Sequence, residues 1–183
     1  NTTGASNTAL GTEALNSNTT AANNVAVGYQ AGKSNTTGSA NTAVGSLALD
    51  ANTAGVELTA VGKSALSAST GSYNTAMGSG AMSSTTTATH NAAFGRIALS
   101  LNTTGSNNVA VGSRALYATT TASSNSAVGA NALTTNTTGA SNTAVGSSAL
   151  YANTNGVSNT AVGTNALTAN TTASDNTAIG TSA

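Results

Sequence analysis

The chain contains no cysteine, no proline and no tryptophan, and only 4% of its residues are charged. Without cysteine, disulfide bonds cannot stabilise the fold. The four Lys and Arg residues are too few for the basic stripe that phosphate binding requires, so we expect no nucleic acid partner. No apolar run approaches the roughly 20 residues of a membrane-spanning helix, so we expect no membrane insertion of this segment.

Side chains that perform chemistry are equally sparse. His90 is the single histidine, and without cysteine it cannot assemble a usual zinc site. The four carboxylates are dispersed, with no pair at a shared place in adjacent repeats that could form an acid/base dyad. The serines lack a base, and the glycines lack the Lys-Ser/Thr of a phosphate loop. We therefore expect no enzyme, no metal site and no cofactor.

What the chain does contain favours order. Hydrophobic residues make up 38% of the sequence and the net charge is zero, whereas disordered chains usually have few apolar residues or a high net charge. The apolar residues also recur at fixed places. A folded, repetitive structure is the resulting prediction.

The phrase Ala-apolar-Gly recurs eleven times, with its glycines 17 residues apart except for one interval of 16 between Gly62 and Gly78. The consensus, numbered here as positions 1 to 17, reads N-T-A-V-G-x-x-A-L-x-x-N-T-T-G-x-x. The short copy fits if one residue near position 14 is dropped. Residues 1–183 are thus one repetitive segment. Its repeats start at residues 7, 24, 41, 58, 74, 91, 108, 125, 142, 159 and 176.

Comparing the copies separates inside from outside. Positions 3 and 8 are always alanine, position 5 is always glycine, and position 4 is always apolar. Position 9 is Leu or Met except at Gly32, and position 13 is always threonine. Charged residues occur only at positions 6, 7, 10 and 17. Because charge is tolerated where a side chain reaches water, these variable positions should form the exterior.

The repeat predicts an all-β protein, a β-solenoid or β-roll of eleven 17-residue coils. A 17-residue unit is too short for a helix pair, and alternation with period 2 fits positions 1–5. We expect a strand over positions 1–5, a turn, a second strand over about positions 8–13, and a turn at positions 14–17. Coils stacked about 4.8 Å apart would make a rod on the order of 50 Å long.

Stacking places identical side chains in columns. The asparagines at position 1 are expected to form an amide ladder that fixes the register. This ladder comprises Asn7, Asn24, Asn41, Asn74, Asn91, Asn108, Asn125, Asn142, Asn159 and Asn176. Positions 4 and 9 are expected to form the core. The core residues are Val27, Val44, Val61, Val111, Val128, Val145, Val162, Leu49, Leu66, Leu99, Leu116, Leu133, Leu150 and Leu167.

Two large apolar groups per coil are few against the backbone entropy of 17 ordered residues. A face made of small, constant residues would let another chain approach closely, so we expect several chains, three in number, to pack side by side on it. The inter-chain packing residues would be Ala26, Ala43, Ala60, Ala76, Gly28, Gly45, Gly62 and Gly78. Neither end carries a distinct polar capping coil, so we expect a piece of a longer fibre or ends covered by neighbours.

The phrases NVAVG at 24–28, NTAVG at 41–45 and NTAIG at 176–180 resemble the head repeats of trimeric autotransporter adhesins. They are equally similar to the shaft repeats of phage tail fibres. The resemblance covers the whole chain and implies a β-roll of three associated chains. The adhesin repeat is usually shorter than 17 residues, and this chain has no heptad stalk and no membrane anchor, so the fibre class fits better than the autotransporters themselves.

The resulting expectation is a non-catalytic fibre or adhesin segment, a shaft or head that holds a binding tip away from a cell or virion surface. Its partners would be further copies of the chain and an unidentified surface glycan or host receptor. The alternatives are a self-polymerising extracellular filament and an ice-binding solenoid that uses the threonines at position 13. N-T-T sequences, formally glycosylation acceptors, are expected to serve turns instead. They start at Asn1, Asn18, Asn35, Asn102, Asn136 and Asn170.

Overall fold

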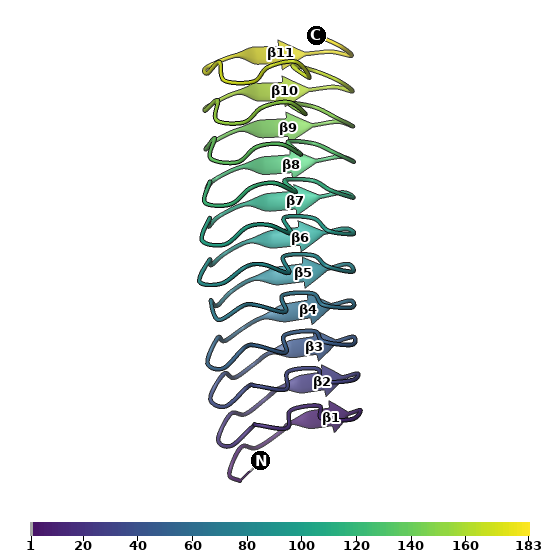
Figure 1. The fold of residues 1–183 in the computed structure, drawn as a ribbon, viewed down its shortest axis with the longest axis vertical. Coiled ribbons are helices and arrows are strands. Elements are labelled where there is room, and N and C mark those ends of the chain that lie inside the picture. The colour runs from purple at the N-terminus through teal and green to yellow at the C-terminus, as the bar shows by residue number, and fades with distance from the viewer. Residues whose placement is uncertain (1) are drawn as a thin grey trace.

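The protein is an all-β solenoid of about ten turns in the computed structural model, which describes residues 2–183 and contains no helix in that range (Figure 1). The strands are β1 (Thr8–Leu10), β2 (Val25–Val27), β3 (Thr42–Val44), β4 (Thr59–Val61), β5 (Thr75–Met77), β6 (Ala92–Phe94), β7 (Val109–Val111), β8 (Ser126–Val128), β9 (Thr143–Val145), β10 (Thr160–Val162) and β11 (Thr177–Ile179). The predicted β-solenoid is confirmed.

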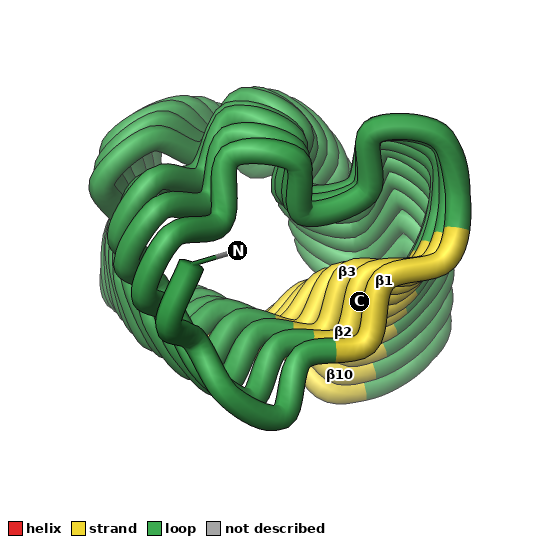
Figure 2. The backbone as a smooth tube through the Cα atoms, turned by 90° about the horizontal axis from the view of Figure 1, so that it is seen from below, coloured by secondary structure: helices red, strands yellow, loops and turns green. Residues whose placement is uncertain are grey.

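All eleven strands form one parallel sheet in chain order, from β1 to β11. Their pairing is strictly in register, so that Ala110 of β7 lies opposite Ala127 of β8. The shortened repeat keeps this register, because Thr59 and Val61 pair with Thr75 and Met77. Viewed along the axis, the sheet occupies one side of the coil and turns close the remainder (Figure 2). Each repeat position therefore forms a column along the rod.

The second strand expected over positions 8–13 is wrong. That part of each coil consists of turns, in which the residues at positions 7 and 9 adopt left-handed backbone angles, such as φ 60° at Arg114 and 51° at Leu116. The Arg114 N–H donates to the Arg96 carbonyl of the preceding coil at 3.1 Å, and the Leu116 N–H donates to Ala132 of the following coil at 3.0 Å. The coils thus stay hydrogen-bonded to each other without strand geometry.

The interior is narrow and filled mainly by small residues. Alanines at positions 3 and 8 and leucines at position 9 make up most of the buried apolar cluster. Leu49, Leu66, Leu99, Leu116, Leu133 and Leu150 are fully buried, and Leu167 packs partly buried against them. Most coils therefore bury one large apolar side chain instead of the two that the repeat suggested; the coil with Gly32 buries none at position 9, and the coil that starts at Leu58 buries a second leucine.

The valines expected in the core lie outside. Alternate residues of a strand point to opposite faces, so the buried alanine at position 3 puts positions 2 and 4 on the outer surface. All seven valines are half-buried or exposed on the outer surface, so the prediction that they form the core is wrong. They are Val27, Val44, Val61, Val111, Val128, Val145 and Val162.

The small residues expected to pack against other chains instead pack inside this one. Ala26, Ala43, Ala60 and Ala76 are at most 2% exposed. Gly28, Gly45, Gly62 and Gly78 lie against the backbone of the next coil, and a Cβ on Gly45 would come within 2.6 Å of the Gly62 carbonyl oxygen. Their size is required by coil-on-coil stacking within one chain, since a larger group at either position would push the coils apart.

Candidate functional surface

The outer face of the sheet carries an unbroken column of apolar side chains at position 4, here called the apolar stripe. In the inner coils some members are exposed, from 38% of the residue surface at Phe94 and Val145 to 42% at Met77. The other members of the inner coils are half-buried. Strand register sets each member beside the next, as Val128 beside Val145. The stripe consists of Leu10, Val27, Val44, Val61, Met77, Phe94, Val111, Val128, Val145, Val162 and Ile179.

A second outward column, at position 2, runs beside the stripe. It consists mostly of threonine, with Val25, Val109, Ala92 and Ser126 as the departures. No ionisable side chain occurs at positions 1 to 5 of any coil, so the sheet face is uncharged along its whole length. Soluble monomers rarely expose long contiguous apolar patches, and those that exist mark contact sites. The sheet face is the strongest candidate for association.

The asparagines at position 1 form a buried column inside the coil. The Oδ1 of Asn108 accepts the backbone N–H of Asn125 at 3.0 Å, and its Nδ2 donates to the Ala122 carbonyl at 2.9 Å. Direct amide-to-amide bonds add to these in places, such as Asn159 to Asn142 at 3.1 Å. The ladder therefore links side chain to backbone more than side chain to side chain. At Leu58, where the column lacks asparagine, the Asn41 Oδ1 accepts the Leu58 N–H at 2.9 Å.

The asparagines at position 12 form a second buried column. Because the N-T-T sequences start at this position, the column determines whether their amides are accessible for glycosylation. Asn18, Asn35, Asn102 and Asn136 are at most 2% exposed, and each donates its Nδ2 to a carbonyl three residues on. Asn170 donates in the same way to Ala173 at 3.0 Å. The four buried amides are inaccessible to a glycosylating enzyme in the folded chain, whereas Asn170 is half-buried. Asn1 lies outside the described residues.

The threonines at position 13 use their hydroxyls to join the coils. The Thr103 Oγ1 donates to the Thr120 carbonyl at 3.0 Å, and the same carbonyl accepts the N–H groups of Thr103 at 2.8 Å and Thr104 at 3.3 Å. Thr86 and Thr137 repeat the hydroxyl contact at 3.0 Å with Thr103 and Thr154. A threonine hydroxyl has a single hydrogen, so the members of the column that make this contact present no free donor to an outside surface.

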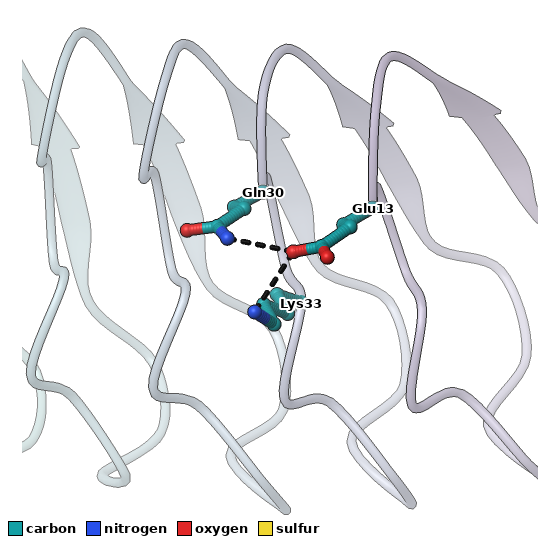
Figure 3. Close-up of polar contacts among 3 residues, drawn as sticks. All are labelled: Glu13, Gln30 and Lys33. Atoms are coloured by element: carbon teal, nitrogen blue, oxygen red, sulfur yellow. Dashed lines mark hydrogen bonds and ion pairs between the residues drawn. The ribbon is translucent and has the colours of Figure 1, made fainter.

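Charged side chains are few and lie at the surface, where Lys33 and Asp50 are half-buried and the others are exposed. Lys33 Nζ lies 2.8 Å from Glu13 Oε2, and the Gln30 amide donates to the same oxygen at 2.6 Å, joining two successive coils (Figure 3). The hydrogen bond from Lys33 lowers the pKa of Glu13 below its ordinary value, and the bond to Glu13 raises the pKa of Lys33. Burial raises the pKa of the Asp50 carboxyl. The Lys33–Glu13 contact is the one ion pair within residues 2–183.

Aromatic contacts occur in the middle of the rod. Tyr73 and His90, at position 17 of successive coils, stack with ring centroids 5.0 Å apart. The Arg114 guanidinium lies 4.9 Å from the centroid of the Tyr117 ring. Both contacts are on the exterior, as the variability of their positions predicted.

No group of three or more metal-ligating side chains comes together within residues 2–183. A hollow of about 360 Å³ lies at the last coil, beside Leu167, Asn170 and Asn176, and no ionisable side chain lines it. The described range also includes no helix with the length and hydropathy needed to cross a bilayer.

Comparison of the chain with protein-family models, with curated proteins and with solved structures gives no match. The surface must therefore be interpreted from its own residues.

Proposed function

We propose that this chain is a non-catalytic segment of an extracellular fibre, an adhesin shaft or head, whose copies pack side by side as a homotrimer through the apolar stripe. The observation that carries the proposal is the stripe itself. It is apolar in all eleven coils, faces outward, and has no charged neighbour at positions 1 to 5.

The packing of the interior supports association. Most coils bury one leucine and two alanines as their main apolar content, which is little burial for 17 ordered residues. Covering the stripe would add one large apolar side chain per coil to what is removed from water. A stripe one residue wide and about 50 Å long suits convergence of several rods on a common axis, and the resemblance to trimeric adhesin heads favours three.

The mechanical role follows from the hydrogen-bond columns. Backbone bonds, the two asparagine columns and the threonine hydroxyls all connect one coil to the next. Such a rod holds whatever lies at its tip at a fixed distance from a cell or virion. The uncharged Ser, Thr and Asn surface limits unspecific association.

The test replaces Val128 and Val145 with lysine. Both side chains are exposed, so the isolated chain should keep its fold, while the two charges should be incompatible with a buried stripe. We expect the molar mass to fall to that of one chain with an unchanged circular dichroism spectrum. The matched control is Ala130→Lys with Ser147→Lys, two exposed residues of the same coils outside the sheet face. An assembly that survives V128K/V145K would contradict the proposal.

Ice binding is a second candidate, because positions 2 and 4 form two regular outward columns side by side on the sheet face. Position 13 forms only a single column. The Thr hydroxyls at position 13 are engaged with the next coil, so ice recognition would have to use positions 2 and 4. Ice-recrystallisation inhibition by a monomeric wild-type chain, lost in V128K/V145K, would favour this function over the fibre.

A further inference from the structure

Three of the four cationic side chains of the chain stand without a carboxylate partner. Lys33 is paired with Glu13. Lys63, Arg96 and Arg114 are exposed and form no salt bridge within residues 2–183. Asp50 belongs to position 10, and Glu57 and Asp175 belong to position 17, at the opposite end of the strand from position 6.

Backbone contacts place the three cations on one edge of the rod. The Gly80 N–H donates to the Lys63 carbonyl and the Ile97 N–H to the Ser79 carbonyl, both at 2.9 Å. The Arg114 N–H donates to the Arg96 carbonyl at 3.1 Å. The three side chains therefore follow one another along positions 6 and 7 of four successive coils. From the strand spacing, Lys63 is about 10 Å from Arg96 along the axis and Arg96 about 5 Å from Arg114.

Arg96 and Arg114 lie in successive coils without a counter-ion, and like charges repel each other. Contact with the Tyr117 ring, 4.9 Å away, holds the Arg114 guanidinium in place. Guanidinium groups match the oxygens of sulfate and carboxylate groups, with which they form paired hydrogen bonds. The arrangement is suited to an anion that this chain does not itself supply.

We propose that this cationic edge, formed by Lys63, Arg96 and Arg114, binds an acidic polysaccharide lying along the fibre axis. Along the axis the cations follow one another at about 10 and 5 Å, and they are too few for the continuous basic stripe that binding of a nucleic acid requires. Positions 6 and 7 of the same coils also carry the exposed Ser79 and Ser113 and the half-buried Ser64, whose hydroxyls can bond to sugar hydroxyls. The inference goes beyond the proposed fibre and does not require its assembly.

The test measures binding of dextran sulfate and of polygalacturonate to the 183-residue chain by calorimetry at low salt, with neutral dextran as the uncharged control. We expect binding of an acidic polymer that weakens as salt is added. R96Q/R114Q should lower the affinity at least about tenfold, since the loss of one hydrogen bond to a charged group already corresponds to about a tenfold change in affinity. Lys33→Gln removes a cation from a different position and should leave the affinity within about twofold.

Absence of binding to both acidic polymers would overturn the proposal, as would equal loss of affinity in K33Q and R96Q/R114Q. Binding of single-stranded DNA in preference to both polysaccharides would also overturn it. The molar mass of every sample is recorded alongside, so that a failure of assembly is distinguished from a failure of the cationic edge.

Discussion

At the residue scale, the asparagine at position 12 and the residue at position 15 are coupled. Asn52 and Asn102 accept the N–H of Gly55 and Gly105 through Oδ1, at 2.9 and 3.1 Å. A Cβ on Gly105 would come within 2.6 Å of that oxygen. Where position 15 is alanine, the fit is lost: the buried Oδ1 of Asn18 has no partner opposite Ala21.

The same coupling accounts for Thr85 and Thr119, which stand at position 12 before Ala88 and Ala122 and whose buried hydroxyls have no hydrogen-bond partner. We expect Thr119→Asn alone to change stability little, because Ala122 blocks the new Oδ1. Ala122→Gly alone should destabilise by about 0.5 to 1 kcal/mol. Together they should stabilise the fold by about 1 kcal/mol more than the sum of the single changes.

Denaturant unfolding of the four proteins of this double-mutant cycle measures the coupling. Thr121→Asn with Ala122→Gly is the control, since Thr121 is exposed and should show no coupling. Simple additivity in the T119N/A122G cycle would refute the pairing of positions 12 and 15.

At the scale of the element, each strand is only three residues long and is followed at once by the glycine of position 5. Gly112 follows β7 with φ 132°, and a Cβ there would lie 2.5 Å from the Gly129 carbonyl oxygen. Both facts concern the step from strand to turn, where successive coils come closest. The glycine column thus sets the distance between coils as much as the strand hydrogen bonds do.

Gly112→Ala should therefore destabilise the rod by about 3 kcal/mol or more, by combining backbone strain with overpacking. Ser113→Ala, the next residue and exposed, should stay within about 0.5 kcal/mol of the wild type. Thermal and denaturant unfolding of the two variants decide the matter, and a G112A protein as stable as S113A would show that the coils have room to separate.

The turns show why part of the element structure escaped prediction from sequence. Leucine rarely adopts left-handed backbone angles, yet Leu99 and Leu116 both have φ 51°. The geometry is held by the N–H bond to the neighbouring coil and by burial of the side chain, such as the 2.9 Å bond from Leu99 to Ala115. Local preference therefore favours a strand where tertiary stacking imposes a turn.

At the scale of the whole molecule, the repeat predicted the solenoid, the coil boundaries and the columns, because a fixed 17-residue period has few ways to bury a continuous core. It did not tell which face of the strand is inside. The alternation of a strand places the side chains of positions 2 and 4 on one face and that of position 3 on the other. It does not say which of the two faces points into the coil.

A signal for the correct face was nevertheless present. Position 4 accepts Met77 and Phe94 beside valine, whereas position 3 is alanine in every coil. The inward face of the strand keeps the size of its side chain constant, while the outer surface tolerates the change; away from the strand, the buried column at position 9 does vary, with Met82 and Gly32 beside leucine. Within the strand, uniform size of a column thus indicates the interior better than hydrophobicity does.

Assembly through the apolar stripe is the central claim at this scale, and the molar mass of the 183-residue chain in solution tests it most directly. Light scattering should give three times 17.3 kDa, independent of protein concentration over a dilution series. A mass of 17.3 kDa at every concentration would contradict the claim, because the exposed stripe would then be stable in water without a partner.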